Sequence, residues 1–281
     1  MRVMLSCLIF AGSLAFPGLA FPGLARAQSS TLTLSAGDGS RAFTAAELLA
    51  RPDARTLEVA ADVAYGRPMT YRAVPLLALL GDGVAPAFDT LEAKATDGFV
   101  AQIPLDLVRK GASGGSVAWI AVEDVSAPWP PLPGKAVSAG PFYLVWEDPE
   151  RSGVGSEQWP FQVAELTLTE PPVHRWPQMA VAANLPEDAP ARRGEAVFAV
   201  QCLPCHRMKG AGASDVGPDL GLPMSPTQYM TREGLRALIR DPKAVRTWPG
   251  QQMPGFDAAT LPDADLDDLI AYLGYMADRP R

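Results

Sequence analysis

Hydrophobic and polar positions alternate along much of residues 28–170, and this pattern predicts a domain that mixes strands and helices. A period of two indicates a strand with one buried face, whereas an unbroken apolar run such as residues 117–122 indicates a strand buried on both faces. Asp97-Gly98 between two alternating runs predicts a tight hairpin. Strands are expected at residues 31–34, 57–61, 91–95, 99–103, 117–122, 141–146 and 161–168.

Capping and turn signals add three short helices to these strands. Thr44-Ala45-Ala46-Glu47 has the pattern of a capping box and predicts a helix that runs through Ala50. A second helix is expected over residues 74–80, with Pro75 in its first turn. A third is expected over residues 105–110, where a glycine follows the last helical residue. The fold class predicted for residues 28–170 is therefore α+β.

The character of the chain changes after residue 170. Residues 171–190 hold five prolines, which remove backbone donors and favour an extended linker. Its one histidine, His174, is expected to be exposed. From residue 191 the pattern becomes helical, and apolar positions four apart predict a helix that ends near Cys202. Further helices are expected over residues 231–240 and 263–276, so residues 191–281 are predicted to be an all-α domain.

The N-terminus has the features of a secretory signal peptide. Arg2 gives a basic start, an apolar stretch follows, and Ala25-Arg26-Ala27 fits a cleavage site before Gln28. We therefore expect residues 1–27 to be removed on export to the periplasm, with no stable membrane span afterwards. Removal would change the net charge from −7 to −9, because this segment holds two arginines and no acidic residue. Such an acidic protein is not expected to bind nucleic acid.

The motif with the clearest chemistry is Cys202-Leu203-Pro204-Cys205-His206. Two cysteines three residues apart share one side of a helical turn, so both sulfurs can reach the vinyl groups of one porphyrin. The histidine that follows can supply one axial nitrogen to the iron. A zinc site needs about four ligands and would have to recruit His174 at an unusual spacing. A thioredoxin-like dithiol needs a βαβ context, which the helical pattern here does not provide.

Residues 191–281 resemble a class I c-type cytochrome. The resemblance rests on the cysteine motif, on Gly194 and Phe198 upstream of it, and on Gly217-Pro218-Asp219-Leu220 after it. It implies one covalent haem c, held through Cys202 and Cys205, with His206 on the iron. It also implies that the first helix crosses the last one closely at Gly194, and that the carbonyl of Pro218 accepts the imidazole N–H.

The resemblance also implies a methionine as the second axial ligand. Met253, in Gln251-Gln252-Met253-Pro254-Gly255-Phe256, lies in a loop just before the last helix and matches the family's distal methionine loop. Met253 is therefore the predicted ligand, and Met224 is the alternative. A thioether on the iron raises the reduction potential relative to a second histidine.

Residues 55–170 resemble the molybdenum-cofactor domain of sulfite-oxidase-type oxidoreductases. The matching stretches are Asp97-Gly98-Phe99 leading into Ile103-Pro104-Leu105, then Gly140-Pro141-Phe142-Tyr143-Leu144-Val145, and Gln158-Trp159 before the last strand. That family binds molybdenum through a cysteine thiolate, and this domain has no cysteine. No catalytic residue is carried over. The alternative is an unrelated small α+β domain.

Two functions follow as hypotheses. The first is a periplasmic cytochrome that carries single electrons, with the N-terminal domain as a docking module for redox donors and acceptors, such as a molybdoenzyme dehydrogenase. On this hypothesis the chain is an electron-transfer protein rather than an enzyme. The second is a single-chain oxidoreductase, in which the N-terminal domain oxidises a small substrate and passes electrons to the haem.

Overall fold

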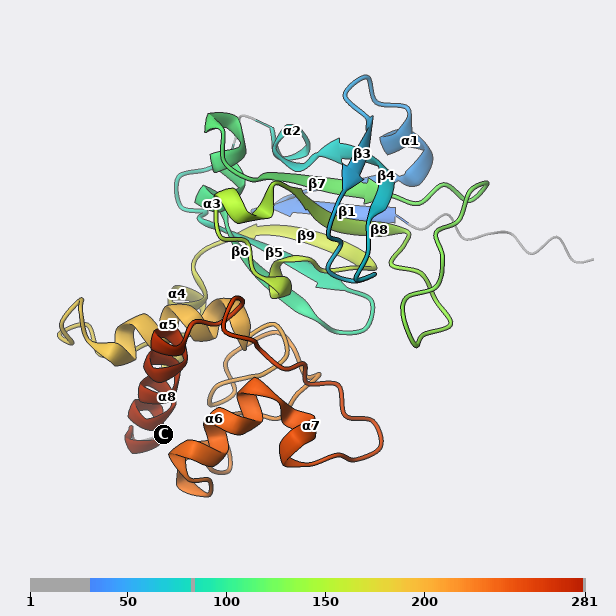
Figure 1. The fold of residues 1–281 in the computed structure, drawn as a ribbon. Coiled ribbons are helices and arrows are strands. Elements are labelled where there is room, and N and C mark those ends of the chain that lie inside the picture. Colours follow the sequence, from blue (N-terminus) through green and yellow to red (C-terminus); the bar gives the residue numbers. More distant parts are fainter. Residues whose placement is uncertain (1–30, 82–83, 280–281) are drawn as a thin grey trace, which may run out of the picture.

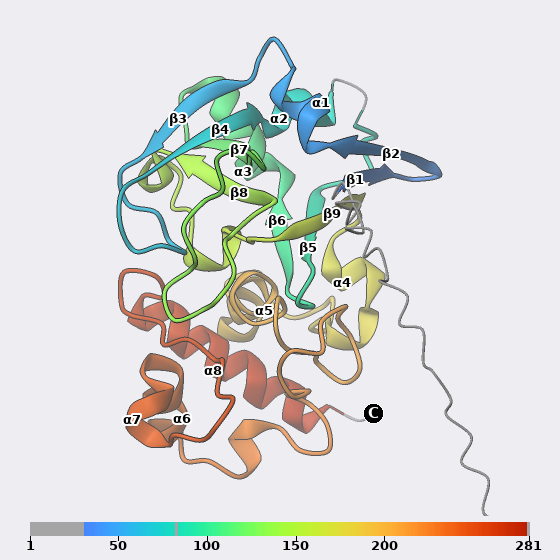
Figure 2. The same cartoon turned by 90° about the vertical axis from the view of Figure 1, so that its right-hand side faces the viewer.

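The computed structural model describes residues 31–81 and 84–279. The predicted signal peptide, residues 1–27, lies outside the described residues. The described chain forms a sheet-rich N-terminal region and an all-helical C-terminal region that lies below it in Figure 1 and Figure 2. Within the described residues, no helix combines the length and the apolar character needed to cross a membrane.

The first of two N-terminal sheets has five strands in the order β2-β1-β9-β5-β6. Its strands are β1 (Thr31–Ala36), β2 (Gly39–Thr44), β5 (Thr90–Ala95), β6 (Val100–Pro104) and β9 (Val163–Thr169). β1 pairs with β9 in parallel, and the other pairs are antiparallel. β5 and β6 form the hairpin expected from Asp97-Gly98, and Gly98 has a φ of +93° that favours glycine at this turn.

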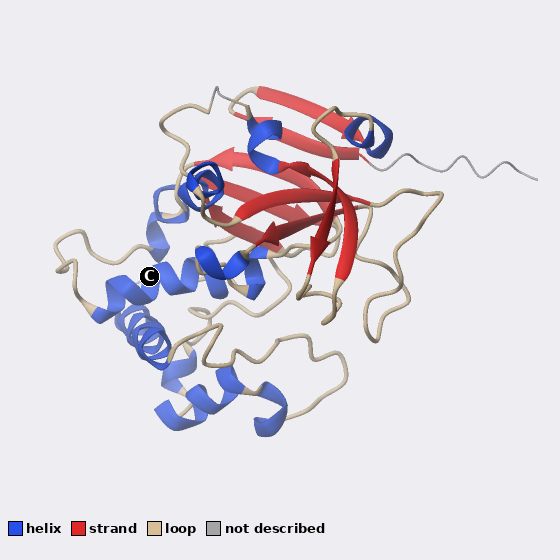
Figure 3. Ribbon diagram, turned by 45° about the horizontal axis from the view of Figure 1, so that its top comes forward, coloured by secondary structure: helices blue, strands red, loops and turns tan. Residues whose placement is uncertain are grey.

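The second sheet has four antiparallel strands in the order β3-β4-β7-β8. Its strands are β3 (Arg55–Val59), β4 (Met69–Pro75), β7 (Val117–Val122) and β8 (Phe142–Glu147). Figure 3 shows the two sheets with short helices around them, namely α1 (Ala45–Leu49), α2 (Leu76–Leu80) and α3 (Leu105–Lys110). Buried residues from both sheets belong to one hydrophobic core, so the two sheets fold as a unit.

Most of the predicted elements are confirmed, with two strands missed. The capping box of Thr44 and Glu47 is present at the start of α1, and the apolar run 117–122 is β7. The helix expected over residues 74–80 begins only at Leu76, because β4 continues to Pro75. β4 alternates buried and exposed residues, but the Pro75 signal favoured a helix there. β2 is almost wholly exposed, so its sequence carries no period-two pattern.

A buried carboxyl group ties the second sheet together. Asp62 is 2% exposed and accepts hydrogen bonds from the backbone of Tyr65 (2.8 Å) and from the hydroxyls of Tyr71 (2.7 Å) and Tyr143 (3.4 Å). Burial raises the pKa of Asp62, and the three donors act in the opposite direction. Every polar contact of this group stays within the N-terminal domain, so its role is structural.

The C-terminal region is built on a close crossing of two helices, α5 (Pro190–Gln201) and α8 (Asp263–Asp278). A Cβ at Gly194 would lie 1.9 Å from the carbonyl oxygen of Asp268, so only glycine fits at the crossing. The rings of Phe198 and Tyr272 pack beside it with centroids 5.2 Å apart. The crossing expected at Gly194 is confirmed. The other two helices are α6 (Arg232–Arg240) and α7 (Pro242–Val245).

Residues 171–190, expected to be an extended linker, pack on both regions. α4 (Pro172–Arg175) places Arg175 against the first sheet, where its guanidinium bonds Glu92 and Gln102, both at 2.7 Å. Met179 is fully buried in the C-terminal core, and its carbonyl accepts the Tyr272 hydroxyl at 2.8 Å. His174 is exposed, as expected.

Candidate haem site

The cysteine motif forms a tight turn directly after α5. The backbone N–H groups of Cys205 and His206 both donate to the carbonyl of Cys202, at 3.1 and 2.8 Å. Leu203 points into the core and is 1% exposed, which anchors the turn. Cys202 and Cys205 are half-buried and are not joined by a disulfide. The turn therefore holds two unpaired sulfurs and one imidazole within five consecutive residues.

His206 is held in one orientation. Its Nδ1 lies 2.8 Å from the carbonyl oxygen of Pro218, and because a carbonyl can only accept, Nδ1 carries the hydrogen. Nε2 then has its lone pair free for a metal. Burial lowers the pKa of His206, although the hydrogen bond to Pro218 opposes this, so the ring is neutral near pH 7. A Cβ at Gly217 would lie 2.5 Å from the ring, so glycine there permits this packing.

Asp219 organises the loop that carries Pro218. Its carboxylate accepts hydrogen bonds from the backbone of Lys209 (3.0 Å), Gly210 (2.6 Å) and Gly221 (2.7 Å). These bonds fix residues 209–221 and so fix the position of the Pro218 carbonyl. Asp219 belongs to the motif Gly217-Pro218-Asp219-Leu220, but its role was not predicted from the sequence. The local signal for this role was a carboxylate that directly follows a proline and lies two residues from a glycine on each side.

The loop of Met253 is anchored by Arg240 at the end of α6. The Arg240 guanidinium donates to the carbonyls of Phe256 at 2.8 Å and Leu261 at 2.6 Å. A Cβ at Gly255 would lie 2.5 Å from the Arg240 carbonyl, so the loop approaches α6 closely. Met253 is half-buried and packs against the C-terminal core. Arg240 is a second residue that sequence reasoning missed.

Three further methionines that follow the cysteine motif lie in surroundings that differ from those of Met253. Met224, the alternative ligand, is 48% exposed. Met208 and Met276 are fully buried within the hydrophobic core of the C-terminal region. Met253 and Met230 both combine a loop position with partial burial against that core. The role of Met253 as an iron ligand stays a prediction.

Both thiols are neutral in this environment. Burial raises the pKa of Cys202 and of Cys205, the latter to about 12, and the carboxylate of Glu157 acts in the same direction. Reactive or metal-binding cysteines instead have a lowered pKa, because the thiolate is the reactive form. The environment does not favour a thiolate metal site or a redox dithiol.

The match to a known family agrees with this geometry. Residues 189–273 match the family model described as cytochrome c oxidase, cbb3-type, subunit III. The C-terminal region is a c-type cytochrome domain. Its match begins at the start of α5 and ends within α8, and the N-terminal region lies outside it. No curated protein shows a significant match to the chain.

The residues of the cytochrome domain fit a haem. Gln251, two residues before Met253, has a buried side-chain Nε2 with no hydrogen-bond partner among the described residues. A buried amide donor needs an acceptor, and a haem propionate is an acceptor of the right kind. The domain thus offers a ligand for each kind of contact that a haem makes. Nε2 of His206 can bind the iron, the two thiols can add to the vinyl groups, and the amide of Gln251 can donate to a propionate.

The N-terminal domain contacts the cysteine motif directly. The backbone N–H of Val100 donates to the carbonyl of Pro204 at 3.1 Å, and the Ser214 hydroxyl donates to the carbonyl of Gly98 at 3.0 Å. Both bonds involve the β5–β6 hairpin. On the neighbouring surface, a Cβ at Gly155 would lie 3.1 Å from the side chain of Gln201. The hairpin therefore lies directly against the cysteine motif and the loop that follows it.

Proposed function

We propose that the chain is an exported electron-transfer protein that carries single electrons through one haem c, bound by thioethers to Cys202 and Cys205. The observation that carries this proposal is the contact of 2.8 Å between His206 Nδ1 and the carbonyl of Pro218, because it leaves Nε2 free next to two neutral thiols. A bound haem supplies reversible exchange of one electron at its iron.

The chain's own residues set the conditions for this exchange. His206 is kept neutral and oriented by Pro218, and Asp219 holds the loop of Pro218 in place. Met253 is proposed as the second axial ligand, because Arg240 holds its loop against α6. If His206 and Met253 both bind the iron, no coordination position would stay open, which would disfavour the binding of small molecules at the iron and favour electron transfer through the haem edge.

We further propose that the protein acts in the periplasm. The support is the pattern of residues 1–27, with its basic start, apolar stretch and Ala25-Arg26-Ala27. N-terminal sequencing of the protein recovered from a periplasmic fraction should begin at Gln28. A cytoplasmic product that begins at Met1 would contradict this.

The N-terminal domain is proposed to dock a redox partner. The β5–β6 hairpin contacts the cysteine motif through Val100 and Pro204, so a partner bound on this domain would lie near the haem. The resemblance to the molybdenum-cofactor domain of sulfite-oxidase-type enzymes makes a molybdoenzyme dehydrogenase the favoured class of partner. The domain's lack of cysteine is the reason to propose docking rather than molybdenum binding.

A potentiometric titration tests the proposed electron transfer. The absorbance of the purified protein should follow a reversible curve for one electron. A protein with no reversible haem couple would contradict the proposal. Metal analysis tests the alternative, a single-chain oxidoreductase. Molybdenum at about one atom per chain would favour that alternative and overturn the docking role.

A further inference from the structure

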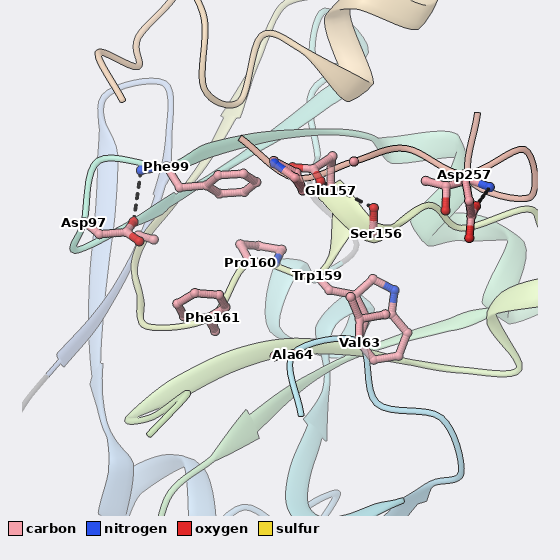
Figure 4. Close-up of a pocket in the computed structure, with 14 residues that line it drawn as sticks. Val63, Ala64, Asp97, Phe99, Ser156, Glu157, Trp159, Pro160, Phe161 and Asp257 are labelled. Atoms are coloured by element: carbon pink, nitrogen blue, oxygen red, sulfur yellow. Dashed lines mark hydrogen bonds between the residues drawn. The ribbon is translucent and has the colours of Figure 1, made fainter. Parts of the chain in front are cut away.

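A cavity of about 350 Å³ lies between the N-terminal domain and the loop that follows Met253 (Figure 4). The N-terminal side is formed by residues from the β5–β6 hairpin, from the loop before β4 and from the segment before β9. The other side is formed by Pro254, Gly255, Asp257 and Thr260 of the cytochrome domain. This volume is in the range of cavities that bind small molecules.

The cavity is negatively charged. Asp97, Glu157 and Asp257 line it, and its lining within the described residues contains no lysine or arginine. The backbone N–H of Thr260 at 2.8 Å lowers the pKa of Asp257, so this carboxylate is ionised at neutral pH. Lys135 stacks on the ring of Phe161, with Nζ 4.6 Å from the centroid, but does not line the cavity. Arg240 does not line the cavity, but it is near enough to Asp257 to help lower the pKa of that carboxylate.

The wall also presents a hydrogen-bond donor without a partner. Trp159 is 4% exposed and lines the cavity, and its indole N–H has no acceptor among the described residues. The Trp159 side chain is largely buried, but its indole nitrogen is not among the buried atoms, so this N–H is open to a molecule in the cavity. Together with Phe99 and Phe161, Trp159 supplies aromatic faces to the same space (Figure 4). Aromatic faces attract cations, in particular where water is excluded.

We propose that this cavity binds a small organic molecule that carries an ammonium group and a hydrogen-bond acceptor. The carboxylates of Asp97 and Asp257 compensate the positive charge, and Glu157 adds to them where it is ionised, because its pKa is raised to about 7. The aromatic rings contact the ammonium or its apolar neighbours, and the indole N–H of Trp159 donates to the acceptor. An anion of the same shape is excluded by the carboxylates. A neutral molecule leaves the carboxylates without a partner and binds more weakly.

The cavity does not use the residues that are proposed to hold the haem. None of Cys202, Cys205, His206 and Met253 is among the described residues that line the cavity. Glu157 is nevertheless near enough to raise the pKa of both thiols, and Pro254 directly follows Met253. If the proposed haem function holds, a cation in the cavity favours the reduced iron, which carries one positive charge fewer, and raises the haem potential.

Calorimetric titration of the full holoprotein with three molecules of one shape tests the binding. Tyramine carries the ammonium group, 4-ethylphenol lacks it, and 4-hydroxyphenylacetate carries a carboxylate instead. We expect tyramine to bind at least about tenfold more tightly than the other two, which corresponds to one desolvated charge contact. Equal affinity for the three molecules, or no binding of tyramine, would overturn the proposal.

Variants locate the site. Glu157→Gln should weaken tyramine binding by about fivefold or more, because it removes the charge and keeps the shape. Trp159→Phe removes the indole N–H together with part of the ring and should also weaken binding by about fivefold or more. Glu58→Gln makes the same charge change on an exposed strand position of the N-terminal domain and should leave the affinity unchanged. Unchanged affinity in both cavity variants would place tyramine elsewhere and refute the site.

Measurement of the haem midpoint potential tests the ligand site and the proposed electron-transfer function separately. Saturating tyramine should raise the haem midpoint potential of the wild type and have less effect in Glu157→Gln. If the protein shows a reversible haem couple but no tyramine binding, the cavity proposal fails and the proposed function stands. If tyramine binds and no haem couple exists, the proposed function fails and the ligand site stands.

Discussion

The backbone N–H of Val100 donates a hydrogen bond of 3.1 Å to the carbonyl oxygen of Pro204. Val100 begins β6 at the edge of the first sheet, and Pro204 lies between the two cysteines of the haem motif. An edge strand with free backbone groups is open to pairing, and here one of those groups is used to hold the cytochrome domain. The two domains therefore meet at the motif that we propose binds the haem, which would place the N-terminal domain where it can influence electron exchange.

The segment between the domains should contribute to the stability of the cytochrome domain. A fragment of residues 170–281 keeps Met179 and Val181, which are 0% and 6% exposed, whereas a fragment of residues 184–281 lacks both. Burial of two such side chains is worth about 3–6 kcal/mol. Chemical denaturation of the two haem-loaded fragments should show a lower free energy of unfolding for the shorter one by about this amount. Equal stability would mean that the segment does not pack on the isolated domain.

Substitution at the crossing of α5 and α8 should be severe. Gly194→Ala places a methyl group 1.9 Å from the Asp268 carbonyl oxygen, so the helices must separate. Overpacking of this kind costs about 1–3 kcal/mol or more. Gly274→Ala is the matched control, because it lies in α8 with no atom within 4 Å of the new methyl group. It should leave stability unchanged or raise it by up to about 1 kcal/mol. Similar thermal denaturation of both variants would argue against the crossing.

Met253→Ala should change the ligands of the iron. Loss of the thioether removes the absorption band that sulfur ligation gives to the oxidised haem, and it lowers the midpoint potential. Met224→Ala is the control, because Met224 is 48% exposed and should leave both properties unchanged. The reverse pattern, in which only Met224→Ala alters the spectrum, would reassign the ligand to Met224.

Glu157 should make stability depend on pH. Burial raises the pKa of Glu157 from its ordinary value of 4.5 to about 7 in the folded protein. Because the folded state binds the proton more tightly, this contribution is fully present below pH 4.5 and is lost as the pH rises through 7. The free energy of unfolding of the wild type should fall relative to that of Glu157→Gln between these pH values. Parallel pH profiles for the two proteins would show that Glu157 does not titrate in this way.

Local signals account for the elements that were predicted from the sequence. The Asp97-Gly98 turn, the capping box of Thr44 and the apolar run of β7 each depend on residues close together in the chain, and each is present. β2 was missed because an exposed edge strand has no hydrophobic face to produce a pattern. At Pro75 the sequence favours the first turn of a helix, but this residue pairs with β7, so the strand β4 continues to Pro75 and the helix starts after it.

The same distinction holds for the site. The cysteines and His206 lie within five residues, so their spacing alone indicates a haem. Arg240 and Glu157 were missed because they act on residues distant in the sequence, namely the carbonyls of the Met253 loop and the thiols of the motif. Such contacts depend on how the helices and the two domains pack. The pattern of residues along one sequence does not show which distant residues come together.

The mass of the mature protein under denaturing conditions tests the central claim most directly. A covalent haem on Cys202 and Cys205 predicts the mass of the polypeptide plus one haem, absorbance that stays with the denatured chain, and no titratable thiol. A mass equal to that of the polypeptide alone, with two free thiols and no retained colour, would contradict the account.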